Sequence, residues 1–160
     1  MAVDRSKKLT TLVLVGVFTA LATGIAIGVQ STLSSRIGTL IGSFKTGVLM
    51  NAIGGLIAGL ILLILLIVNG KGFWQLPATA LIMLVVAGAL GILIITGVAF
   101  SLQKIGIAAG LAILIFGQMV ISVIADSKGW GGGTPVPVTL PRIFGLVVLA
   151  AGIYLLLPKK

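Results

Sequence analysis

The stretch Thr46–Gly70, TGVLMNAIGGLIAGLILLILLIVNG, determines the fold class of this chain because it contains no charged residue. A bilayer core of roughly 30 Å requires about 20 predominantly apolar residues in a helix, and this stretch is long enough. Only helices and closed barrels span a bilayer, and barrel strands alternate polar and apolar residues, which this stretch does not. It therefore predicts a membrane-spanning helix.

Four further stretches are uncharged in the same way: Leu9–Ser35, Gly72–Gln103, Ile105–Ala125 and Ile143–Pro158. We therefore predict an all-α transmembrane protein, a five-helix bundle in which residues 1–160 form a single transmembrane domain. The expected helices cover residues of about 9–33, 43–69, 76–101, 105–125 and 141–157. Gln103 and Lys104 are expected to form the tight turn between the third and fourth helices.

The composition supports this prediction, with 59% hydrophobic residues, 8% charged residues and a mean hydropathy of +1.33. A soluble domain carries about 25% charged residues, so this chain needs a bilayer as its solvent. Its net charge of +9 comes from 11 basic and 2 acidic residues. Because the basic residues lie at span ends, without aromatic stacking platforms, we expect membrane lipid headgroups as partners and no nucleic acid.

The chain contains no Cys and no His, and its only acidic residues are Asp4 and Asp126. These absences leave no candidate for an acid pair, a nucleophile system or a metal cluster. We therefore expect no enzymatic activity, no catalytic residue, no metal and no cofactor. The lack of a carboxylate inside any span also argues against the simplest proton-exchange mechanism. Asp126 is expected to cap a helix end or to pair with Lys128 or Arg142.

A few polar residues lie inside the expected spans, where burial in lipid is costly and marks either function or helix–helix hydrogen bonding. Gln118 lies about midway along the fourth expected helix, and Ser122 lies on the same helix face. Together with Gln30 and Asn51 they are the candidate substrate-binding residues. Amides offer both donors and acceptors and suit a neutral polar ligand.

Glycine is abundant, with 23 residues, and many of them lie four positions apart. Small residues at this spacing let membrane helices approach each other closely, although chance also produces the spacing at this density. We expect at least two of the following pairs to lie in packing seams: Gly24/Gly28, Gly38/Gly42, Gly55/Gly59 and Gly106/Gly110.

The odd number of spans places the two termini on opposite sides of the membrane. The N-terminal side collects six basic residues, namely Arg5, Lys7, Lys8, Lys71, Lys128 and Arg142. The other side collects five, namely Arg36, Lys45, Lys104, Lys159 and Lys160. Orientation depends on an excess of Lys and Arg on one side. Two alternatives follow: insertion both ways with an antiparallel dimer, or one weakly favoured orientation with the N-terminus in the cytoplasm.

Three stretches carry a family resemblance: GIAIGVQSTLSSRIG at residues 24–38, GQMVIS at 117–122 followed by Asp126 and Gly129, and LPRIFG at 140–145. With them the chain resembles the five-helix, half-size bacterial branch of the drug/metabolite transporter superfamily. Larger relatives contain ten helices in two inverted five-helix halves. The resemblance therefore implies half of such a transporter, working as an antiparallel homodimer in a bacterial or archaeal inner membrane.

The resemblance also implies a function, which is the export of small metabolites or amphipathic compounds by alternating access. In this interpretation Gln30, Asn51, Gln118 and Ser122 line a central uncharged site. Two alternatives remain open. A non-transporting membrane subunit or adaptor would pair its polar groups between helices, and a channel- or scramblase-like conduit would contain a continuous groove.

Overall fold

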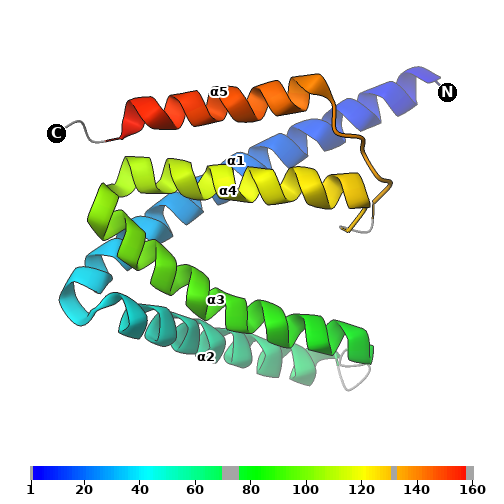
Figure 1. The fold of residues 1–160 in the computed structure, drawn as a ribbon. Coiled ribbons are helices and arrows are strands. Elements are labelled where there is room, and N and C mark those ends of the chain that lie inside the picture. Colours follow the sequence, from blue (N-terminus) through cyan, green and yellow to red (C-terminus); the bar gives the residue numbers. More distant parts are fainter. Residues whose placement is uncertain (1, 70–75, 131–132, 158–160) are drawn as a thin grey trace.

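The structure, a computed structural model, describes residues 2–69, 76–130 and 133–157, with all their side chains except those of residues 2–12 and 69. These residues form five helices and no strand, which confirms the all-α class (Figure 1). The helices are α1 (Ala2–Ile41), α2 (Ser43–Asn69), α3 (Ala78–Ile105), α4 (Ile107–Lys128) and α5 (Leu140–Leu156). The first four are long and apolar enough to cross a membrane, and α5 is a shorter apolar helix.

Two of the connections between helices consist of a single glycine. Gly42 separates α1 from α2, and Gly106 separates α3 from α4, with φ angles of 88° and 85°. Non-glycine residues rarely adopt these angles, whereas glycine adopts them at little cost. The expected turn at Gln103 and Lys104 is therefore wrong, because both residues lie in the last turn of α3 and the chain reverses at Gly106.

The first helix also continues beyond its expected end near residue 33, past Arg36, to Ile41. A charged residue marks where a span meets the headgroups, but arginine is a good helix former and does not stop a helix. The same reasoning explains why α3 and α4 extend to Ile105 and Lys128. In each of these helices the stop is a glycine with positive φ that follows the last helical residue.

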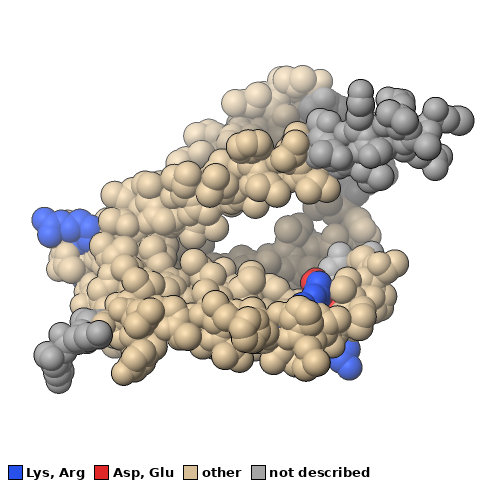
Figure 2. Space-filling model, turned by 90° about the horizontal axis from the view of Figure 1, so that it is seen from above, with Lys and Arg blue, Asp and Glu red and all other residues tan. Residues whose placement is uncertain are grey.

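The buried core lies toward one end of the molecule, which contains both glycine turns and is called here the closed end. The residues other than glycine that are buried there are Ser31, Ser34, Ser35, Thr46, Val98, Ala99, Leu102, Ala109 and Ile153. Away from this end, the α2–α3 pair and the α4–α5 pair diverge (Figure 1). The space-filling view shows an opening through the middle of the molecule (Figure 2). The chain is therefore packed at one end and splayed apart at the other.

Helices α2 and α3 approach each other closely at Gly47. A Cβ atom added to Gly47 would lie 2.8 Å from the carbonyl oxygen of Ile92 and would collide with the Thr96 hydroxyl. The oxygen of that hydroxyl is buried without a hydrogen-bond partner among the described residues. Close approach of small residues is the usual way in which membrane helices pack, since lipid supplies no hydrophobic drive between them. Gly47 therefore fixes how α2 sits on α3.

None of the four predicted glycine pairs packs against another helix through both of its glycines. No atom lies within 4 Å of the position that a Cβ atom would occupy at Gly24, Gly28, Gly55 or Gly59. In the other two pairs only one glycine packs, Gly38 against Gln103 and Gly110 against Leu102, while the second forms a turn. The prediction that at least two pairs form seams is therefore wrong within a single copy of the chain.

Candidate functional site

A pocket with polar groups lies where α1, α2 and α3 meet. It consists of two adjoining hollows of about 160 and 660 Å³, which share Gln30, Met50 and Asn51 in their linings. Gly91 of α3 completes the smaller hollow and lies at the middle of its helix. Because α3 is long enough to span the bilayer, Gly91 places the α3 wall of the pocket near mid-depth, where secondary transporters have their substrate sites.

Asn51 is half-buried in the wall of this pocket. Its Nδ2 donates a 2.8 Å hydrogen bond to the carbonyl oxygen of Gly47, one turn earlier on α2. Its Oδ1 faces Gly91 and would lie only 2.8 Å from a Cβ atom at that position. The glycine therefore leaves room for the amide, and the Oδ1 atom keeps its capacity to accept a hydrogen bond.

Gln30 approaches the pocket from α1. Its backbone carbonyl accepts a 2.8 Å hydrogen bond from Ser34 Oγ, which also contacts Met50 Sδ at 3.3 Å. Ser34 thus joins the α1 side of the pocket to α2. The side chain of Gln30 is exposed, and its amide makes no hydrogen bond to another described residue. Both donor and acceptor groups of Gln30 are consequently available to a ligand.

Gln118 and Ser122, the other two predicted site residues, lie on α4, and both are exposed. Neither lines the hollows that contain Gln30 and Asn51. A single copy of the chain therefore brings together two of the four candidates, on α1 and α2, and leaves the other two on a different helix.

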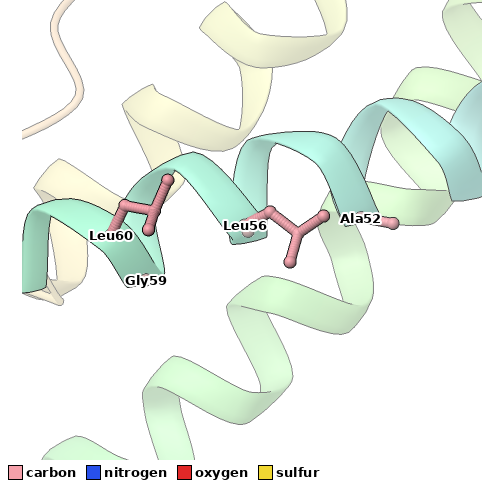
Figure 3. Close-up of a pocket in the computed structure, with 5 residues that line it drawn as sticks. Ala52, Leu56, Gly59 and Leu60 are labelled. Atoms are coloured by element: carbon pink, nitrogen blue, oxygen red, sulfur yellow. The ribbon is translucent and has the colours of Figure 1, made fainter. Parts of the chain in front are cut away.

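A third hollow, of about 580 Å³, lies along α2 and shares Ala52 and Gly55 with the larger hollow of the pocket (Figure 3). It is lined by Ala52, Gly55, Leu56, Gly59 and Leu60, all from one helix. Such a surface has no polar group with which to orient a ligand, whereas ligand sites combine apolar walls with a few placed polar groups. It is a helix face suited to contact with lipid or another helix.

Two described residues, Asp126 near the end of α4 and Arg142 near the start of α5, form an ion pair. Arg142 Nη1 lies 3.3 Å from Asp126 Oδ2, so Asp126 pairs with one of the two partners expected for it. The carbonyl oxygen of Asp126 also accepts hydrogen bonds from the backbone N–H groups of Gly129 and Val136. Asp126 thus ties the end of α4 to the connection and to the start of α5.

Met50, Gly91, Gly47 and Thr96 were not predicted. One signal was present, because Gly47 and Asn51 lie four residues apart and this spacing places a small residue and an amide on one helix face. Nothing in the sequence indicates that Gly91 is the residue opposite Asn51, since this pairing depends on how α2 and α3 are aligned.

Comparison with known proteins defines the family. A family model described as "Putative inner membrane exporter, YdcZ", of the drug/metabolite transporter type, matches residues 15–155. The chain belongs to this family. No curated protein and no solved structure matches it. The YdcZ family assignment confirms the resemblance seen in the sequence and, with the apolar helices, identifies a multi-pass membrane protein.

Proposed function

We propose that this YdcZ-family chain exports small polar or amphipathic metabolites across the inner membrane, by alternating access as an antiparallel homodimer. The observation that carries the proposal is the mid-depth pocket, which presents the amides of Gln30 and Asn51 between apolar walls. The lining residues among those described carry no charge, so the pocket suits a neutral or weakly polar compound better than a multivalent cation. The family description supports export as the direction.

The unpaired amide of Gln30 favours a transporter over an adaptor. An adaptor has no use for a polar group at mid-depth unless that group joins two helices, because an unsatisfied amide is costly in lipid. Among the described residues, the Gln30 amide is left without a partner. In the proposed transporter, a substrate supplies the missing hydrogen bonds.

The proposed dimer is supported by helix faces that make no close contact within one copy of the chain. Gly24 and Gly28 on α1, and Gly55 and Gly59 on α2, present small-residue faces with open space around them. A half transporter with an odd number of spans needs an inverted copy to form the two-fold pathway of larger relatives. The second copy would place its own α4, with Gln118 and Ser122, opposite the pocket.

The difference between the two ends of the molecule supports alternating access. The helices are packed at the closed end and diverge at the other (Figure 1). Rocking of the α4–α5 pair relative to α2 and α3 would open one end while it closes the other, as rigid bundles do in inverted-repeat transporters.

An efflux screen tests the proposal. Proteoliposomes are loaded with a mixture of neutral amides, amino acids, alcohols and amphipathic amines, and mass spectrometry follows what leaves. We expect one chemical class to leave faster than it does from protein-free liposomes. Efflux of no compound would contradict the proposal in favour of an adaptor, and equal efflux of all compounds and salts would contradict it in favour of a conduit.

A further inference from the structure

Three helices meet at the closed end around the side chain of Gln103. Its Nε2 donates a 3.2 Å hydrogen bond to Ser43 Oγ at the start of α2. The same side chain packs over Gly38 of α1. This contact, called here the three-helix junction, therefore places Gly38, Ser43 and Gln103 side by side.

A basic residue lies within two positions of each member of the three-helix junction. Arg36 precedes Gly38, Lys45 follows Ser43, and Lys104 follows Gln103. All three are exposed, and none forms a salt bridge with another described residue. Like charges at the same end of a molecule repel each other, and they attract an anion from their surroundings.

The two acidic residues of the chain, Asp4 and Asp126, lie on helix segments far from the junction. Asp126 is near the end of α4, a helix of 22 residues that begins beside the junction, which corresponds to roughly 30 Å. Asp4 lies near the opposite end of α1. The space-filling view shows basic side chains at the end of the molecule opposite the Asp126 carboxylate (Figure 2). Neither acidic side chain of the chain can therefore neutralise the basic residues at the junction.

An apolar groove adjoins the same charges. It has a volume of about 410 Å³ and runs along the α3–α4 turn from Lys104 through Gly106 to Ala109, with Leu156 of α5 on its other side. The Lys104 ammonium lies 5.7 Å from the centre of the Phe100 ring, so the alkyl stem of Lys104 follows the helix surface. An apolar groove with an ammonium at its rim matches an amphiphile that has an anionic head and an apolar tail.

We propose that the three-helix junction binds the phosphate headgroup of an anionic phospholipid through Arg36, Lys45 and Lys104, while an acyl chain lies in the groove beneath Lys104. The position at the ends of spanning helices places these charges at headgroup depth. The lipid supplies an anion at a place that neither acidic side chain reaches. Because both single-glycine turns lie at this end, the bound lipid also holds the closed end together.

The probes are phosphatidylglycerol, which is anionic, and phosphatidylcholine, which is neutral overall. Each lipid is titrated into the purified protein in detergent, and native mass spectrometry counts the bound lipid molecules. Each basic residue near an anionic headgroup contributes an affinity gain of about fivefold. We therefore expect about fivefold weaker phosphatidylglycerol binding in Lys104→Gln, and about hundredfold weaker binding when Arg36→Gln and Lys45→Gln are added. The matched control is Lys128→Gln, another exposed lysine at a helix end, which should leave binding unchanged.

A second variant tests the groove separately from the charges. Ala108 is exposed and lines the groove, so Ala108→Trp should weaken phosphatidylglycerol binding while it leaves all three basic residues in place. In the unmodified protein, raising the salt concentration from 0.1 M to 1 M shortens the screening length from about 10 to about 3 Å and should release the lipid.

Several results would overturn the proposal. Binding of phosphatidylglycerol at the unmodified strength by the triple variant would do so, as would an equal loss in Lys128→Gln. Equally tight binding of phosphatidylcholine would show that charge is not recognised. Displacement of the lipid by an equimolar amount of inorganic phosphate would show a free-anion site in place of a lipid site. If the triple variant does not fold, the salt experiment on the unmodified protein replaces it. Phosphatidylglycerol binding that does not weaken between 0.1 M and 1 M salt would then overturn the proposal.

Discussion

Asn51 of α2 faces Gly91 at the middle of α3, and a Cβ atom at position 91 would lie 2.8 Å from Asn51 Oδ1. One turn earlier on α2, Gly47 accepts the hydrogen bond from Asn51 Nδ2 and itself packs against Thr96. The α2–α3 contact and the wall of the pocket are thus built from the same few residues. Changes that separate the two helices are therefore expected to alter the pocket as well.

Gly47→Ala is expected to destabilise the protein. The added methyl would meet the Ile92 carbonyl and the Thr96 backbone nitrogen, which cannot move away without displacing a helix. Overpacking of this kind costs about 1–3 kcal/mol. Thermal unfolding in detergent measures the effect, with Gly54→Ala on the same helix as the control, because open space surrounds Gly54. Equal unfolding temperatures for the two variants would show that α2 and α3 do not approach closely at Gly47.

Gly106→Ala should destabilise the protein by a different mechanism. No atom lies within 4 Å of the position that a Cβ would occupy, but the φ of 85° and ψ of 161° are strained for any residue with a side chain. Such strain costs about 1–3 kcal/mol. Gly97→Ala, inside α3 with open space and no positive φ, is the control and should unfold at the same or a higher temperature. A Gly106→Ala protein as stable as Gly97→Ala would contradict the single-glycine turn.

The ion pair between Asp126 and Arg142 should contribute little to stability. The Arg142 and Asp126 side chains are 33% and 54% exposed, and their atoms approach to 3.3 Å. Exposed pairs contribute about 0.2–1 kcal/mol and are weakened by salt. A double-mutant cycle with Asp126→Asn and Arg142→Gln, measured by thermal unfolding, should give a coupling energy in this range. A coupling of several kcal/mol would indicate that another chain buries the pair.

The fold class was predictable from the sequence because charges are excluded from the bilayer core, so the uncharged stretches identify the spans. The helix ends were less predictable. Arg36 and Lys104 mark membrane boundaries, yet both lie inside helices that continue to a glycine with positive φ. Charged side chains indicate where a helix leaves the bilayer core, whereas a glycine with positive φ determines where the helix itself ends.

The site was predictable only in part. Gln30 and Asn51 were recognisable as polar residues in apolar spans, and the structure brings them to one pocket. The role of Gln118 and Ser122 on α4 stays a prediction. Spacing along one helix identifies residues that share a face, but it does not tell which helix that face meets. For the same reason none of the predicted pairs packs through both of its glycines, whereas Gly47 and Gly91, which were not predicted, lie in the α2–α3 contact.

The membrane orientation is open to a direct test because the chain contains no cysteine. Single cysteines replacing Lys8 and Lys160 report which side each terminus faces when labelled with a membrane-impermeant reagent. The side chain of Lys8 and all of Lys160 lie outside the described residues. With six basic residues against five, the proposed dual insertion predicts that each site is labelled from both sides. Labelling of each site from one side only would contradict the antiparallel dimer.

The central claim is that substrate crosses the membrane through the pocket that contains Gln30 and Asn51. The initial rate of substrate efflux tests this claim most directly. Using a compound identified by the efflux screen, rates are compared for Asn51→Leu, which keeps the side-chain size but removes the amide, and for Ile57→Leu on the same helix outside the pocket lining. Loss of one hydrogen bond should slow efflux by roughly three- to tenfold in Asn51→Leu, and Ile57→Leu should retain the original rate. Gln118→Ala should also slow efflux if the second copy contributes its α4. Full efflux by a stably folded Asn51→Leu protein would contradict transport through this pocket.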